Sequence, residues 1–203
     1  ANWFLPAELV SEGNTPEYKY SWGRQNWFDF AAQEHLAVRQ KAGFFDMSSF
    51  AKFRLEGKDA QAVLQRIMAN DVDVEPGRVI YGQWLNNSGG IEADLTVTRL
   101  TETVFLIVTS AASATRDLAW LKKNIPEGAH CIATDITASE AVFSIMGPTA
   151  RDIMQKISTA DFSNTEFPFG TAREIEVGMA LARAHRISSV SYTHLTLPTT
   201  VSV

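Results

Sequence analysis

The sequence is poor in cysteine and has no long apolar run. Its one cysteine, Cys131, can form neither an internal disulfide nor a thiolate metal cluster, so a disulfide scaffold is excluded. The surrounding residues, HCIAT, are typical of a buried strand rather than of an activated thiolate. The longest apolar stretch, Val104–Val108, falls far short of the roughly 20 residues that a helix needs to cross a bilayer. We therefore expect neither a membrane span nor a cysteine-based site.

Basic clusters and nucleotide-binding loops are also missing. The chain carries 18 Lys and Arg against 23 Asp and Glu, and no basic run interleaved with aromatics suggests a nucleic-acid partner. Because no G-x-G-x-x-G or P-loop sequence occurs, a dinucleotide is not expected to bind at a helix terminus. The four histidines lack the spacing of paired metal ligands, and no serine lies in a G-x-S-x-G elbow. Metal catalysis and a serine nucleophile are not indicated.

An internal repeat is the clearest pattern that is present. FRLEGKDAQAVLQRI at 53–67 aligns with FSIMGPTARDIMQKI at 143–157, and each copy reads as a strand, a glycine turn and a helix. Pro148 stands at the start of the second helix. The two apolar helix stripes are Ala60, Val63, Leu64, Ile67 and Met68, and Ala150, Ile153, Met154 and Ile157. Since both helices would bury one face, the sequence predicts an α+β fold with duplicated strand-helix units on antiparallel sheet.

A β-hairpin is predicted between the two copies. The segments VIYGQWL and IEADLTVTRL flank the loop NNSGG, which is rich in residues that tolerate a left-handed backbone. The expected strands outside the repeat are 44–47, 51–55, 79–85, 91–100 and 104–110, and the expected helices are 31–40 and 115–125.

The second strand of this hairpin has one apolar and one polar face. Alternate side chains of a strand share a face, so Leu95 and Val97 point one way. Asp94, Thr96 and Thr98 point the other way. From the pattern alone, Asp94 could simply meet water on the open side of an antiparallel sheet.

Tyr81 and Asn70 are the other candidates near Asp94. Tyr81 lies across the hairpin from Asp94, and Asn70 lies in the segment MANDVDV. Each also has an ordinary structural interpretation, Tyr81 as an amphipathic edge of the core and Asn70 as a helix C-cap. Spacing alone does not choose between these interpretations and a functional one.

Four stretches carry a resemblance to a known family: SWGRQNWF, AVRQKAGFFDMSSFAKFRLEG, MANDVDVEPGRVIYGQWLNNSGGIEADLTVTRL and RDLAWL. They resemble the folate-binding, aminomethyltransferase-like region of dimethylglycine dehydrogenase, sarcosine dehydrogenase and dimethylglycine oxidase. More distantly, they resemble the T-protein of the glycine cleavage system. The resemblance covers 21–187, nearly the whole interpretable chain, and its most specific parts are FDMSSFAKF and GGIEADLTVTRL. It implies the aminomethyltransferase folate-binding fold.

The resemblance also implies a cofactor and site residues. The region binds tetrahydrofolate in that family, and the acid of its G-G-x-x-x-D element, here Asp94, faces the folate near the atoms that accept the one-carbon unit. Capture of an iminium or formaldehyde equivalent releases a proton from nitrogen, which a carboxylate can accept. Tyr81 corresponds to a tyrosine that lines the folate pocket, and Asn70 is carried over as a third folate-binding residue. No metal is implied.

Relatives of the dehydrogenase type carry an FAD domain before this region, where an N-methyl amine is oxidised. We therefore expect 1–30 to be a linker that follows a missing FAD domain, and 31–188 to be an incomplete folate-binding domain. The expected ligands are folate and an intermediate derived from an N-methyl amine. The expected location of the protein is the bacterial cytoplasm or, in a eukaryote, the mitochondrial matrix. The alternatives are a stand-alone folate-binding module and an aminomethyltransferase or demethylase that works without flavin.

The C-terminal end departs from the family pattern. After ALARAHRIS the family continues with a Tyr-x-Gly-Glu-x-Gly-aromatic-Glu motif, whose first glutamate holds the pterin ring, whereas this chain reads SVSYTHLTLPTTVSV. We interpret 189–203 as a tail foreign to the family, which resembles translated sequencing-adapter sequence. The alternative is a natural, divergent strand. Since this glutamate is missing, the resemblance implies that this chain holds the pterin ring less tightly than the family does.

Overall fold

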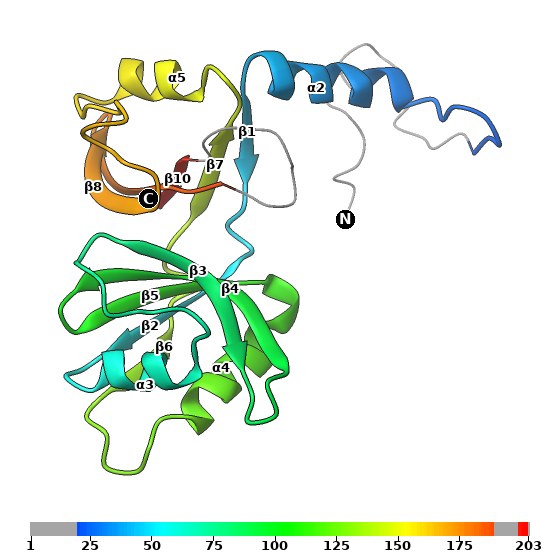
Figure 1. Ribbon diagram of the computed structural model, residues 1–203. Coiled ribbons are helices and arrows are strands. Elements are labelled where there is room, and N and C mark those ends of the chain that lie inside the picture. Colours follow the sequence, from blue (N-terminus) through cyan, green and yellow to red (C-terminus); the bar gives the residue numbers. More distant parts are fainter. Residues whose placement is uncertain (1–19, 189–198, 203) are drawn as a thin grey trace.

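Two five-stranded antiparallel sheets, one above the other in Figure 1, form the fold in a computed structural model that describes residues 20–188 and 199–202. Helices accompany both sheets, so the predicted α+β class with antiparallel sheet is confirmed. The parts of the tail and linker predictions that fall on 1–19, 189–198 and 203 lie outside the described residues. Within the described part of the chain, no helix is long and apolar enough to cross a membrane.

The lower sheet has the strand order β3-β4-β5-β2-β6. Its strands are β2 (Ala51–Glu56), β3 (Val79–Leu85), β4 (Ile91–Thr101), β5 (Val104–Thr109) and β6 (Ile132–Asp135). Three helical elements accompany it, namely α3 (Ala60–Ile67), the 3-10 turn η1 (Ala111–Ser113) and α4 (Ala114–Lys123). Leu64 of α3 and Leu121 of α4 are fully buried in one core with Phe53, Trp84 and Phe105 of the sheet, so this face excludes water.

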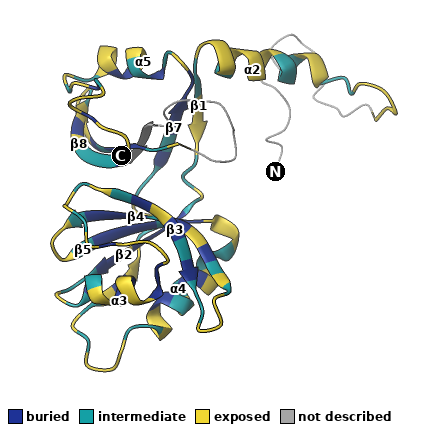
Figure 2. Cartoon of the chain, in the orientation of Figure 1, coloured by how far each residue is buried: buried dark blue, intermediate teal, exposed yellow. Residues whose placement is uncertain are grey.

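The upper sheet has the strand order β1-β7-β10-β9-β8. Its strands are β1 (Gly43–Asp46), β7 (Val142–Met146), β8 (Thr171–Val177), β9 (Ala180–Arg186) and β10 (Thr199–Ser202). The helix α5 (Ala150–Ile157) contributes Met154 to a second core with Phe162 and Phe167. The helix α2 (Phe28–Gln40) extends away from the sheet and buries no residue, as its yellow and teal colouring in Figure 2 shows.

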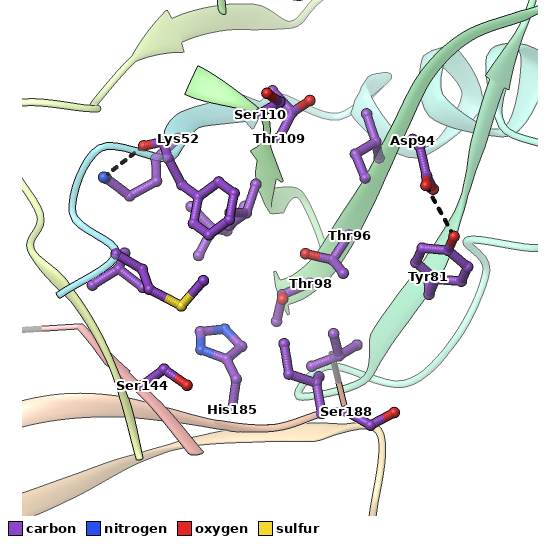
Figure 3. Close-up of a pocket in the computed structure, with 18 of the residues that line it drawn as sticks. Lys52, Tyr81, Asp94, Thr96, Thr98, Thr109, Ser110, Ser144, His185 and Ser188 are labelled. Carbon is purple, nitrogen blue, oxygen red and sulfur yellow. Dashed lines mark hydrogen bonds between the residues drawn. The ribbon is translucent and has the colours of Figure 1, made fainter. Parts of the chain in front are cut away.

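The two faces of β4 differ as the sequence predicts. Leu95 and Val97 are buried in the core beneath the lower sheet, against α3 and α4. Asp94, Thr96 and Thr98 point to the other side, toward the upper sheet (Figure 3). The upper sheet stands across from this face, so Thr98 is buried, whereas Asp94 remains exposed to water.

Each copy of the internal repeat belongs to a different sheet. The first copy forms β2 and α3 in the lower sheet, and the second forms β7 and α5 in the upper sheet. The correspondence extends past the helices: the side chain of Gln65 accepts a hydrogen bond from the Val72 amide at 3.0 Å, and that of Gln155 accepts one from the Phe162 amide at 3.2 Å. The duplication is therefore structural as well as sequential.

The second helix of the repeat is less buried than its stripe predicts. Ala150 and Met154 are completely buried, whereas Ile153 and Ile157 remain 38% and 43% exposed. The expectation that the whole stripe packs on the sheet was therefore wrong for these two isoleucines. The curved β8–β9 ribbon and the loop before it fill only one side of α5 (Figure 1).

The chain passes between the two sheets twice, and the two passages lie against each other. After β1, the Met47 amide donates to the Val142 carbonyl at 2.8 Å. After β6, the Ile136 amide donates to the Lys52 carbonyl at 2.9 Å. The carboxylates that end these two strands also behave alike, because Asp46 accepts from the Ser48 amide and Asp135 from the Thr137 amide, each at 2.9 Å. The crossing is thus nearly symmetric and fixes where the sheets face each other.

Most predicted elements are confirmed with small shifts at their ends. The helix predicted at 31–40 begins one turn earlier, at Phe28, and the strand predicted at 44–47 begins at Gly43. Cys131 requires a correction, because β6 begins only at the following residue and Cys131 is partly rather than fully buried. Burial still raises the pKa of the Cys131 thiol, so it is not activated.

Candidate functional site

A cavity of about 460 Å³ lies between the facing sides of the two sheets (Figure 3). Strands β2, β3, β4 and β5 of the lower sheet and β7 and β9 of the upper sheet supply most of its lining. A volume of this size is within the range of sites that hold small organic ligands or cofactors. Most of the lining is apolar, and the polar side chains occur at a few defined places.

Burial along two facing strands defines a mouth and an inner end. On β4, Asp94 is exposed, Thr96 is half-buried and Thr98 is buried. On the upper side, His185 of β9 is buried, whereas Ser188, which follows β9, is exposed. Asp94 therefore stands at the mouth of the cavity, with Thr98 and His185 toward its inner end.

Asp94 and Tyr81 are joined by a direct hydrogen bond at this mouth. The Tyr81 hydroxyl donates to Asp94 Oδ2 at 3.0 Å (Figure 3). Gln83, the register partner of Asp94 on β3, donates from Nε2 to Asp94 Oδ1 at 3.3 Å. Two neutral donors thus hold the carboxylate in place without neutralising its charge, and the tyrosine ring is half exposed beside it.

The hydrogen bond to Asp94 raises the pKa of Tyr81 above its ordinary value of 10.0, with smaller contributions from desolvation and the Asp94 charge. Because the pKa is higher in the folded than in the unfolded chain, this contribution to stability is complete below pH 10.0 and is lost as the pH rises through the folded value. We expect Asp94→Asn to return the Tyr81 pKa toward 10.0. A phenolate absorbance titration measures this shift, and Tyr81→Phe identifies the phenol. An unchanged titration in Asp94→Asn would contradict the coupling.

Asn70 is close to the pair but is not part of the cavity lining. Its side-chain amide donates to the Tyr81 carbonyl at 3.1 Å, and its Oδ1 accepts from the Asp71 amide at 2.9 Å. The C-cap of α3 is Met68, so Asn70 lies two residues beyond the cap. The structure therefore brings Asn70 to the backbone of β3, where it can position Tyr81, while Tyr81 and Asp94 line the cavity themselves.

Lys52, Ser144 and His185 also line the cavity and were missed at the level of sequence. Lys52 is completely buried in β2, and its ammonium donates to the Ser48 carbonyl at 3.0 Å and the Phe50 carbonyl at 2.9 Å. Burial lowers the Lys52 pKa, although nearby carboxylates oppose this shift. The sequence of β2, AKFRLE, alternates apolar and charged residues, so Lys52 had the same pattern as Arg54 and Glu56 and gave no signal of its own. Ser144 and His185 carried none either.

The site has no cluster of side chains that could bind a metal ion among the described residues. Across residues 20–188 and 199–202, no group of three or more His, Cys, Asp or Glu side chains could hold a metal ion. The chemistry at the mouth of the cavity is that of a carboxylate with two neutral hydrogen-bond donors.

The geometry defines an antiparallel α+β protein with a ligand-sized cavity between two sheets, and comparison with known proteins agrees with this class. Residues 1–193 match the family model described as the GCVT N-terminal domain. The fold is similar to that of the glycine cleavage system aminomethyltransferase T from Bartonella henselae, with a TM-score of 0.73 at 23% identity over 98% of this chain and 53% of that chain. The protein therefore belongs to the glycine cleavage T-protein (GCVT) family.

Two curated relatives extend over almost the whole chain. A 4-methylaminobutanoate oxidase (formaldehyde-forming) from Paenarthrobacter nicotinovorans is 38% identical over 94% of this chain and 22% of its own length. The mitochondrial dimethylglycine dehydrogenase of Homo sapiens is 30% identical over 93% of this chain and 22% of its own length. The chain thus spans about a fifth of the length of these relatives, which by name are enzymes that oxidise amines.

Proposed function

We propose that the chain is the tetrahydrofolate-binding part of an FAD-dependent N-methyl amine dehydrogenase, and that it receives the one-carbon unit that amine oxidation releases. The observation that carries this proposal is the Asp94–Tyr81 pair at the mouth of the cavity between the sheets. The cavity is large enough for a heteroaromatic ligand. Relatives named for 4-methylaminobutanoate and dimethylglycine support the N-methyl amine class.

Asp94 supplies the acid–base chemistry in this proposal. When a folate nitrogen bonds to the electrophilic one-carbon carbon, that nitrogen must lose its proton, and the Asp94 carboxylate accepts it. The hydrogen bonds from Tyr81 and Gln83 fix the direction of the carboxylate. Because both donors are neutral, they orient the base without supplying a competing positive charge.

The flavin belongs to another part of the longer protein. This sequence has no glycine-rich phosphate-binding loop, so its residues do not fit an FAD site of the usual type. When bound in that other part, FAD would take the two electrons from the amine. We propose that the present domain occupies the region up to 188 after a linker that ends at 30. We place the protein in the cytoplasm of a bacterium or in the mitochondrial matrix, in line with its relatives.

The fate of the released carbon tests the proposal. The full-length protein should bind 5-formyltetrahydrofolate saturably, and tetrahydrofolate added during amine turnover should replace free formaldehyde by methylenetetrahydrofolate. Calorimetry measures the binding, and quantification of both one-carbon products measures the partition. If folate does not bind and all of the carbon leaves as formaldehyde, the family fold serves another purpose in this protein.

A further inference from the structure

Ser144 places an unsatisfied hydroxyl at the inner end of the cavity. It is the central residue of β7, its side chain is completely buried, and its Oγ has no hydrogen-bond partner among the described residues. Burying a hydroxyl without a partner is costly, so native proteins almost always satisfy such groups. Other buried atoms of the described residues also lack a partner, among them the indole nitrogens of Trp84 and Trp120. Ser144 differs from these two tryptophans because it lines the cavity, where a bound ligand can supply the partner.

The alternation of β7 directs this hydroxyl toward the ligand. Val142, Ser144 and Met146 line the cavity, whereas Ile145, between them, packs into the core of the upper sheet. Ser144 is thus a polar position between two apolar ones on the same face. Figure 3 shows it on the upper-sheet side of the cavity, near His185.

The surroundings of Ser144 favour an uncharged, hydrogen-bonding ligand edge. Thr98 on the opposite wall is buried, and His185 is placed two strands away, with β10 between the two strands. The only carboxylate that lines the cavity among the described residues is Asp94 at the mouth, and the ammonium of Lys52 is held by backbone carbonyls. An ionised group would therefore have to be desolvated here without a counter-charge directed at it.

We propose that the Ser144 hydroxyl hydrogen-bonds the polar edge of the folate ring and thereby selects a ring that carries such an edge. This inference rests on the proposed folate function and adds a specificity-determining residue to it. With the ring edge at Ser144, the rest of the ligand extends past Thr98 and Thr96 toward Asp94. The charged glutamate tail then remains in water outside the mouth, where it needs no counter-charge.

Ser144→Ala in the full-length protein separates a ligand contact from a structural role. Because the hydroxyl has no partner without ligand, the ligand-free variant should melt at the same temperature as the wild type or higher. Its affinity for 5-formyltetrahydrofolate should fall about 10-fold, since the ring edge then loses its partner. Its affinity for 4-aminobenzoyl-glutamate, which lacks the ring, should not change. Ser139→Ala, at an exposed serine outside the cavity, is the matched control and should change neither affinity.

The outcomes distinguish this inference from the function on which it rests. Equal affinity of wild type and Ser144→Ala for 5-formyltetrahydrofolate, with folate binding intact, overturns the role of Ser144 alone. A melting temperature several degrees lower in ligand-free Ser144→Ala also overturns it, because the hydroxyl would then have a structural partner. Absence of folate binding in the wild type overturns the proposed function itself.

Discussion

Asp94→Asn is expected to lower the rate of one-carbon transfer to tetrahydrofolate about 100-fold or more, the usual effect of removing a general base. The amide keeps the shape of the carboxylate and can still accept a hydrogen bond from Tyr81, so folate affinity should change little. It cannot accept the proton that the folate nitrogen loses. In the proposed function, amine oxidation takes place in another part of a longer protein, so it should continue at the wild-type rate, with the carbon released as formaldehyde.

Single-turnover measurement of methylenetetrahydrofolate alongside amine oxidation provides the test. Asp152→Asn, on the exposed side of α5 and outside the cavity lining, makes the same chemical change and should leave transfer unaltered. Equal yields from Asp94→Asn and the wild type, at matched stability, would show that Asp94 is not the base. Equal loss of oxidation and transfer would instead indicate damage to the whole protein.

The second large effect is expected in stability, from Gly57→Ala at the turn between β2 and α3. Gly57 has φ +136°, a conformation that residues with a side chain rarely adopt. A Cβ there would stand 2.1 Å from the His130 carbonyl oxygen and 2.6 Å from the Cys131 Cα. These neighbours are backbone atoms leading into β6, so they cannot move without breaking that edge of the lower sheet. We expect a loss of more than about 4 kcal/mol in the free energy of unfolding.

Gly128→Ala is the control that separates the cost of backbone strain at a positive φ from the cost of a steric clash between the new Cβ and its neighbours. Gly128 also has a positive φ, +81°, but a Cβ there would meet nothing within 4 Å. Its replacement should cost only the backbone strain, on the order of 1–2 kcal/mol. Urea unfolding of both variants gives the two free energies. A Gly57→Ala variant no less stable than Gly128→Ala would mean that the β2–β6 edge adapts freely.

Local sequence patterns predicted the hairpin with Asp94 and Tyr81 on its two strands, but not the register, in which Asp94 pairs with Gln83 and Tyr81 with Thr96. The alternation along two adjacent strands determines which side chains share a face of a hairpin, so Asp94 and Tyr81 follow from nearby residues. The duplicated units were also visible, because each is a contiguous strand, turn and helix. The matching hydrogen bonds of Gln65 and Gln155 show that the structural similarity of the two units extends beyond the aligned segments.

The other half of the site depends on contacts that no local pattern encodes. Ser144 and His185 reach the cavity only because the upper sheet stands opposite β4, and that arrangement follows from pairings such as β1 with β7. The apolar periodicity of α5 likewise predicted burial for Ile153 and Ile157 without indicating how little chain covers the helix. Tertiary context, rather than propensity, decided these positions.

The placement of the lower sheet within the chain has a consequence for how the protein reaches its native state. All five strands of that sheet lie within 51–135, whereas the upper sheet takes β1 from before this segment and the rest from after it. During synthesis, β1 cannot pair with β7 until the whole lower sheet has emerged from the ribosome. Pairing Gly43 with Met146 closes the longest loop between neighbouring strands in the fold, and contacts of such long range form slowly. The lower sheet can therefore fold first and serve as the template, and the cavity comes into existence only in the last step.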